Sequence, residues 1–345
     1  MFGDRYLKSY GLDGLLTSRY SEIKNYLLSK NISEYAQGHY ALFAGLFDGG
    51  HTGALVGYAP LVKEIVKVTT NAGLNGIVQE AVNRQMDQMY TQAGASSSKK
   101  EAFPQYSAQT NNYYAFDSAT KTAYIGWDEF ESDYIGWDKY YNGKGDVPVK
   151  TDTYAFVREK FYQAKKDGVE NLVLDISTNG GGDTYSLAGV ISLLNKGKAY
   201  YHTLDTFNNV LTTENYLVDI NLDGRFDESD AYEAEQFNFN IGVLTSGYSF
   251  SCANLFPQIA KELGYKIIGH KSGGGSCAIA LQTTPDGLPY VQSSYITLVD
   301  KNGEDVDDGV WTDYQIPTTP LTEKLSDYSN FYDFEVVANY LKTAY

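Results

Sequence analysis

Basic residues are scarce in this chain of 345 residues. Its 27 Lys and Arg stand against 43 Asp and Glu, which gives a formal net charge of −16. Nucleic acids and anionic membranes both require a basic surface, so the charge balance disfavours them as partners. Cysteine is scarcer still, with Cys252 and Cys277 alone. A disulfide between them and a pair of buried thiols are both compatible with the sequence.

Long apolar runs are also missing. No segment approaches the roughly twenty apolar residues of a membrane-spanning helix. The first residues, Met1-Phe-Gly-Asp4, contain neither the basic nor the apolar part of a signal peptide. Because the acidic composition is typical of exported proteins, we expect an extracellular or cell-envelope protein whose targeting segment is absent from this chain.

What the chain does contain points to a folded domain. Hydrophobic residues make up 43% of it and 31 residues are tyrosine, which argues against disorder. Helical spacing of apolar residues alternates with short apolar runs after residue 100, and such alternation predicts an α/β fold. Helices are expected at 152–167, 185–194, 253–263 and 331–341, and strands at 121–127, 172–176, 241–245 and 266–269. The Ser/Lys stretch Gly94–Glu101 divides the chain into an N-terminal helical region, 1–100, and an α/β core, 101–345.

A serine lies beside a predicted helix start in Thr245-Ser-Gly-Tyr-Ser-Phe-Ser251. A serine hydroxyl becomes a nucleophile only with a base and with N–H groups aimed at the oxyanion. Ser251 could also be a simple helix N-cap, because serine favours that position. Ser249 is the rival nucleophile, since Gly247 to Ser251 approaches the Gly-x-Ser-x-Gly pattern of lipases, although its last residue is not glycine.

Two other segments could supply the missing groups. The run 171–183 reads as a buried strand that ends in Gly180, Gly181 and Gly182, whose bare backbone can approach a carbonyl closely. This turn is a candidate oxyanion hole. One of the four histidines, His51, lies in the glycine-flanked turn 46–52, where a general base is plausible.

Along the chain, the histidine turn, the glycine turn and the serine segment follow one another. Together they resemble the C-terminal processing peptidases, tail-specific serine proteases that include the tricorn core and interphotoreceptor retinoid-binding protein. The resemblance covers most of 106–345 and implies a crotonase/ClpP-like spiral of β-sheet and helices. It makes Ser251 the nucleophile. The amide of Cys252 and one from Gly180, Gly181 or Gly182 would form the oxyanion hole. Relatives often carry a PDZ domain, but residues 56–106 lack its carboxylate-binding loop.

The resemblance also bears on the base. One branch of the family uses a lysine in the turn after the Ile-Ile-Gly strand, but Gly275 occupies that position here and Lys271 comes too early in the turn. The other branch uses a histidine near the N-terminus, which corresponds to His51. The acid that orients the histidine aligns with Asp307, and Glu304 is the runner-up. His270 lies close to the presumed site, where we expect it to have an orienting role.

A separate acidic stretch follows the spacing of an EF-hand loop. Oxygen ligands occupy loop positions one, three, five, nine and twelve, with a glycine at position six. The expected ligands are Asp219, Asn221, Asp223, Arg225, Asp227 and Asp230. We expect a structural Ca²⁺ ion here, in an insertion near 219–230, and no cofactor for catalysis. A solvated acidic turn without metal is the alternative.

Together these features predict a serine endopeptidase that hydrolyses peptide bonds in peptide or protein substrates through an acyl-enzyme, with a Ser-His-acid triad. The alternative is a non-catalytic ligand- or partner-binding protein, because retinoid carriers use the same scaffold. A surface module that scaffolds polysaccharide or partner chains has weaker support, since a single calcium loop lies inside a folded domain.

Overall fold

The computed structural model describes residues 20–45, 51–54, 75–106, 111–283 and 289–345. These residues form two compact units. The larger unit comprises 88–202, 212–276 and 299–345, and the smaller one comprises 1–87, 203–211 and 277–298. No helix among the described residues is long and apolar enough to cross a membrane.

The larger unit is built on a six-stranded sheet in the order β11-β8-β7-β4-β3-β2. Neighbouring strands are parallel from β3 to β11, and β2 pairs antiparallel to β3 at one edge. Both β3 and β4 are buried along their whole length, as expected for parallel strands that are covered on both faces. The strands are β2 (Asn112–Asp117), β3 (Thr122–Trp127), β4 (Asn171–Asp175), β7 (Asn240–Thr245), β8 (Lys266–Gly269) and β11 (Tyr314–Gln315).

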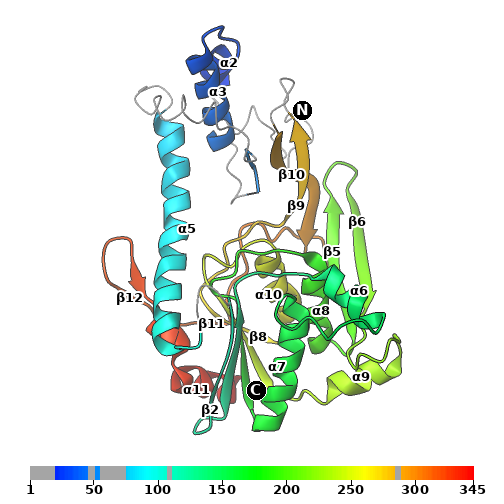
Figure 1. Ribbon diagram of the computed structural model, residues 1–345. Helices are drawn as coiled ribbons and strands as arrows, with labels where there is room; N and C mark the ends of the chain where they lie inside the picture. The colour runs from blue at the N-terminus through cyan, green and yellow to red at the C-terminus, as the bar shows by residue number, and fades with distance from the viewer. Residues whose placement is uncertain (1–19, 46–50, 55–74, 107–110, 284–288) are drawn as a thin grey trace. The chain divides into compact units, whose positions relative to one another are not determined.

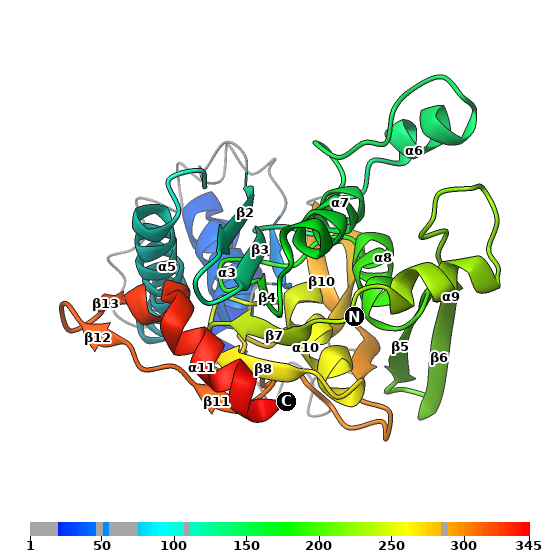
Figure 2. The same ribbon diagram turned by 90° about the horizontal axis from the view of Figure 1, so that it is seen from below.

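Helices cover both faces of this sheet. Figure 2 shows α11 (Phe334–Ala344) on one side and α7 (Thr153–Asp167), α8 (Thr184–Leu194) and α10 (Cys252–Glu262) on the other. Successive side chains of a strand alternate between faces, so Val173 of β4 joins the cluster that contains Phe331 and Leu341 on the α11 side. The α/β fold class expected from the sequence is confirmed.

Local signals set the helix ends. Asp152 caps α7 by accepting a hydrogen bond from the Ala155 amide, and Gly168 ends the helix in the left-handed conformation. Asp183 caps α8 in the same way, through the Tyr185 amide. The remaining elements of the larger unit are α6 (Tyr134–Tyr141), α9 (Glu228–Glu235), β12 (Thr319–Pro320), β13 (Ser326–Asp327) and the short 3₁₀ helix η2 (Ser329–Tyr332).

The smaller unit contains α2 (Tyr20–Leu27), α3 (Ile32–Gly45), β1 (Gly53–Ala54), β9 (Cys277–Thr283) and most of β10 (Pro289–Val299). Both β1 and β9 pair antiparallel with β10. Besides β10, three elements contribute residues to both units: β5 (Lys198–Asp205), β6 (Val210–Leu217) and the long helix α5 (Asn75–Ala102), which Figure 1 shows as one continuous helix.

The Ser/Lys stretch 94–101 is the last part of α5, although its polar composition suggested a division there. The first of the two compact units runs to Asp87 and the other begins at Gln88, and the predicted boundary near residue 100 stays a prediction. Within this stretch Lys99 is fully buried, whereas its neighbour Lys100 is exposed.

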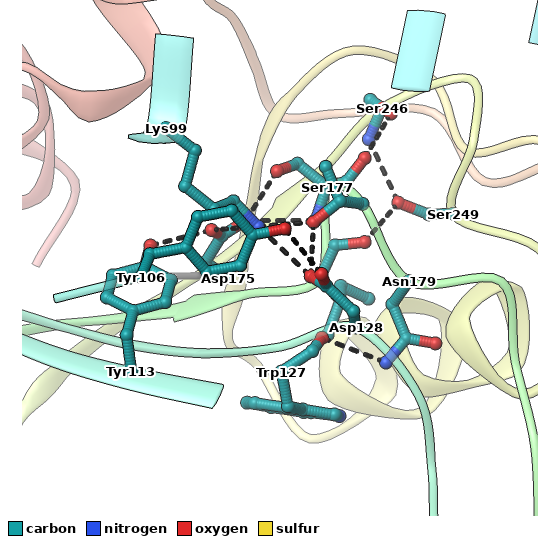
Figure 3. A network of polar contacts seen from close by, with 12 residues as sticks. Lys99, Tyr106, Tyr113, Trp127, Asp128, Asp175, Ser177, Asn179, Ser246 and Ser249 are labelled. Carbon is teal, nitrogen blue, oxygen red and sulfur yellow. Dashed lines mark hydrogen bonds and ion pairs between the residues drawn. The ribbon is translucent and has the colours of Figure 1, made fainter. Parts of the chain in front are cut away.

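The buried Lys99 ammonium joins α5 to the central sheet (Figure 3). Its Nζ lies 2.8 Å from the Asp175 carboxylate at the end of β4 and 3.4 Å from that of Asp128 after β3. It also donates a hydrogen bond to Thr178. Tyr113 donates to the Asp175 carboxylate over 2.7 Å. The charges are therefore matched by ion pairs and hydrogen bonds, which is the condition for keeping them out of water.

Removing this cation should be costly. In Lys99→Met, the buried Asp175 carboxylate loses its ammonium partner, and we expect the free energy of unfolding to fall by about 3–5 kcal/mol. Lys100→Met removes the same charge from the exposed neighbour and should change little. Urea unfolding of both variants measures the difference, and equal effects would contradict the structural role of Lys99.

Candidate active site

Ser251 occupies a strained position between β7 and α10. It is the N-cap residue of α10, with φ 57° and ψ −119°, a region that non-glycine residues rarely adopt. Its amide donates to the Gly274 carbonyl over 3.0 Å. Its side chain makes no capping hydrogen bond, so helix capping does not explain the serine. Such strain is typical of functional positions, because the surrounding structure must hold it in place.

The glycine turn after β4 lies directly against this serine. A Cβ atom on Gly181 would come within 2.7 Å of Ser251 Cβ and 3.2 Å of its Oγ. Gly181 also has φ 112°, which other residues rarely adopt. Only glycine therefore lets the turn approach the Ser251 side chain this closely. The structure brings together the two segments that the sequence singled out.

The amides of this turn are not equivalent. The Gly181 amide donates to Asn179 Oδ1 over 2.7 Å, and the Gly180 amide donates to the Asp128 carbonyl over 3.3 Å. Among the described residues, the amides of Gly182 and Cys252 have no protein acceptor. These two amides are therefore available to donate hydrogen bonds to an anion beside Ser251.

Cys252 follows the serine but is a poor nucleophile. Its Sγ donates to the Gly182 carbonyl over 3.1 Å, and burial raises the pKa of the thiol to about 12. Because the thiolate is the reactive form, this cysteine is inert at neutral pH. Cys252 is also a free thiol, so it forms no disulfide. The Cys277 side chain lies outside the part of the protein that the structure describes.

Asp307 is hydrogen-bonded to the turn after β8. Its Oδ1 accepts a hydrogen bond from the Ser276 amide over 3.0 Å, and its carbonyl accepts one from the Gly275 amide. The carboxylate is thus fixed to the same turn whose Gly274 carbonyl holds Ser251. Asp305, which the sequence analysis did not single out, accepts from the Ser276 hydroxyl over 2.9 Å. Glu304, the runner-up, is exposed.

His51 is buried just before β1, and the neighbouring Thr52 hydroxyl accepts the Ser293 amide hydrogen over 3.2 Å. It belongs to the smaller unit, whereas Ser251 and Asp307 belong to the larger one. Its turn includes residues 46–50, which lie outside the described residues. The assignment of His51 as the base, and with it the triad, stays a prediction.

A lysine base in the turn after β8 does not fit the structure. A Cβ on Gly275 would lie 2.2 Å from the Phe250 ring, so no side chain can occupy that position without rearrangement. Lys271 places its ammonium 4.7 Å from the centre of the Trp311 ring. His270 lies 2.9 Å from the Ile316 carbonyl through Nε2 and packs edge-on against Phe331. Burial lowers its pKa, so it serves as a neutral structural group.

The acidic loop 219–230 precedes and enters α9. Asp219 and Asp230 are buried, and their carboxylates accept hydrogen bonds from loop amides, including those of Gly224 and Ile220. The oxygen donors suit Ca²⁺ chemically. Within the described residues, however, no three His, Cys, Asp or Glu side chains are grouped closely enough to hold a metal ion. Calcium binding by this loop stays a prediction.

The chain is similar to a family of known peptidases and to several solved structures. Residues 121–316 match the model of peptidase family S41. A candidate peptidase from Parabacteroides merdae is similar over 89% of this chain and 82% of its own, at 16% identity and a TM-score of 0.56. A candidate S41 protease from Bacteroides fragilis is similar over 67% of this chain and 56% of its own, at 15% identity and a TM-score of 0.43.

The photosystem II D1 C-terminal processing protease is similar over 64% of this chain and 46% of its own, at 20% identity and a TM-score of 0.41. The chain thus spans about half the length of the last two proteins. Comparison with curated proteins gave no significant match. The family match covers more than half of the chain and includes the glycine turn, Ser251 and Asp307. This chain therefore belongs to peptidase family S41, the serine-type peptidases of the C-terminal processing protease type, which confirms the fold and family expected from the sequence.

Proposed function

We propose that this protein is a serine endopeptidase of the C-terminal processing type that cleaves peptide bonds through an acyl-enzyme. The observation that carries the proposal is the strained Ser251, which caps nothing and lies against the bare Gly181 backbone. Holding a serine in such a backbone conformation costs stability, and catalysis by its hydroxyl would explain why the strain is kept. Peptides and proteins are the substrates that family membership implies.

In the proposed reaction, Ser251 Oγ attacks the scissile carbonyl while His51 takes the hydroxyl proton. The amides of Gly182 and Cys252 donate to the oxyanion of the tetrahedral intermediate. His51 then gives its proton to the leaving amine, and the carbonyl stays bonded to Ser251 as an ester. A water molecule, deprotonated by His51, attacks the ester; the bond from the acyl carbon to Ser251 Oγ breaks, His51 returns the proton to Oγ, and the acid is released. Asp307 would orient His51 and stabilise its protonated form.

Replacing the nucleophile tests this proposal directly. Ser251→Ala should abolish peptide hydrolysis and labelling by a fluorophosphonate probe, while the melting temperature does not fall. Ser249→Ala is the matched control, because the Ser249 hydroxyl donates to the Ile176 carbonyl and accepts from the Ser246 amide. It should lower the free energy of unfolding by about 1–3 kcal/mol but leave labelling intact. Labelling that survives in Ser251→Ala would refute the assignment.

The close approach of the glycine turn can be tested separately. In Gly181→Ala, the new Cβ would lie only 2.7 Å from Ser251 Cβ, so the turn must move away from Ser251. This displacement should lower kcat on the order of 100-fold. Gly247→Ala is the control in the neighbouring loop, where a new Cβ would meet nothing closer than 3.9 Å. Its turnover should stay near that of the unmodified chain. Similar kcat values for the two variants would count against the oxyanion site.

A non-catalytic binding protein on the same scaffold is the alternative function. It would retain the fold but give no fluorophosphonate adduct at Ser251, which separates it from the peptidase. The inertness of Cys252 leaves no rival nucleophile in this loop, since Ser249 is buried and hydrogen-bonded.

We also propose an extracellular or cell-envelope location, on the strength of the acidic composition.

We propose further that the loop 219–230 binds a structural Ca²⁺ ion. Within the described residues, neither of the buried Asp219 and Asp230 carboxylates forms an ion pair. A bound cation would offset their desolvation. Asp219, Asn221, Asp223, Asp227 and Asp230 would supply side-chain oxygens, and Arg225 its carbonyl.

Calcium at saturating concentration should raise the melting temperature by several degrees over the same protein in chelator, because a ligand that binds only the folded state stabilises it. Asp223→Ala, at an exposed position of the loop, should remove this response. Magnesium at the same concentration is the control for ionic strength. Identical melts with calcium and with chelator would rule the site out.

A further inference from the structure

A cavity of about 690 Å³ opens beside the glycine turn, within the larger unit. Its base includes Gly180, Gly181 and Gly182. One wall is the last part of α5, where Gln92, Ser96 and Lys100 recur at a spacing of four residues and therefore share one face of the helix. Asp128, Glu129 and Tyr248 also line it. Its volume falls in the range of small-ligand sites and exceeds that of one side chain.

The cavity adjoins the proposed reaction centre through the turn itself. Gly181 lines the cavity and also contacts the Ser251 side chain. A peptide whose scissile carbonyl reached Ser251 could therefore place a neighbouring side chain in this cavity.

Carboxylates outnumber ammonium groups at this site. Among the residues that line the cavity, Asp128 and Glu129 carry carboxylates and Lys100 carries an ammonium group. Lys99 is fully buried and committed to Asp175 and Asp128, so it cannot serve an incoming ligand. Glu129 is exposed, and its carboxylate forms no ion pair within the part of the chain that the structure describes. The cavity also lies at the C-terminal end of α5, where the helix dipole favours cations.

The pKa values of two tyrosines that line the cavity are raised in part by its carboxylates. Burial raises the pKa of Tyr248, and the Asp128 and Glu129 carboxylates raise it further. Tyr106 donates its hydroxyl hydrogen to Asp128, and its pKa is raised first by burial and then by that carboxylate. Both phenols stay neutral at pH 7 and offer oxygen acceptors or fixed dipoles to a ligand.

We propose that this cavity binds a basic side chain, lysine or arginine, of the peptide substrate, with Glu129 as the carboxylate that pairs with it. The inference rests on the proposed peptidase function and adds a specificity to it. An acidic side chain would meet two carboxylates, and a large apolar one would desolvate the polar lining without replacing its hydrogen bonds. Lys100 is exposed and keeps its water shell, so it does not reverse this preference.

Binding to an inactive enzyme tests the specificity apart from catalysis. In the Ser251→Ala background, fluorescein-labelled Ala/Ser peptides would carry one Lys, norleucine or Glu, moved through each position in turn. Fluorescence anisotropy should show that Lys at one position binds on the order of tenfold more tightly than norleucine, and Glu more weakly. Added salt should reduce the advantage of Lys.

Charge variants locate the responsible carboxylate. E129Q should bring the Lys-to-norleucine affinity ratio close to one, whereas E335Q, which removes an exposed carboxylate on α11 outside the cavity, should leave the ratio as it was. K100Q should increase the ratio, because it removes the opposing charge. The proposal fails if no peptide binds, if norleucine or Glu is preferred at every position, or if E129Q leaves the ratio unchanged.

These outcomes are separable from failure of the peptidase function. If the unmodified protein forms no fluorophosphonate adduct but the Ser251→Ala protein binds Lys peptides through Glu129, the cavity is a binding site on a non-catalytic protein. If the adduct forms but E129Q leaves the Lys preference unchanged, the peptidase assignment stands and the cavity inference is wrong.

Discussion

The ion pair between Lys99 and Asp175 is the interaction on which the rest of the larger unit depends. Both side chains are fully buried and their charged groups lie 2.8 Å apart, so each charge offsets much of the cost of removing the other from water. The pair ties α5 to the end of β4. Asp175 then holds the Ser177 amide and hydroxyl, while Lys99 donates to Thr178. Ser177 and Thr178, which lead into the glycine turn, are thus held in place by hydrogen bonds to the two charged groups.

From that turn, hydrogen bonds continue to the serine loop. Ser246 and Ser249 donate to the carbonyls of Ser177 and Ile176, and the Phe250 amide donates to Asn179. Figure 3 shows this chain of contacts from Lys99 to Ser249. Two loops that carry separate parts of the proposed chemistry are therefore held in register by polar groups that are themselves buried and satisfied. Such a network favours one arrangement, because each broken bond leaves a desolvated group unpaired.

The same groups shape the ligand space. Asp128 accepts from Tyr106 and pairs with Lys99 behind the cavity wall, so a structural carboxylate also contributes to the field that an incoming substrate meets. Gly181 keeps the backbone bare beside Ser251, where the proposed reaction would bring a substrate carbonyl. Stability and proposed specificity therefore draw on one set of residues, which limits how far either can change alone.

The sequence by itself determined the local structure and the family. Asp152 and Gly168 mark the ends of α7 through neighbours along the chain, the apolar run 172–176 specifies a buried strand, and the order of motifs identified the S41 peptidases. Only the tertiary structure decided that Lys99 is buried, that Gly182 rather than Gly181 offers an open amide, and that Asp305 lies beside Asp307. A Ser/Lys stretch has the composition of a solvated surface. Its lysine can be buried only because a carboxylate from a strand distant in the sequence replaces the water around the ammonium group. The local pattern of residues does not predict a contact between segments so far apart.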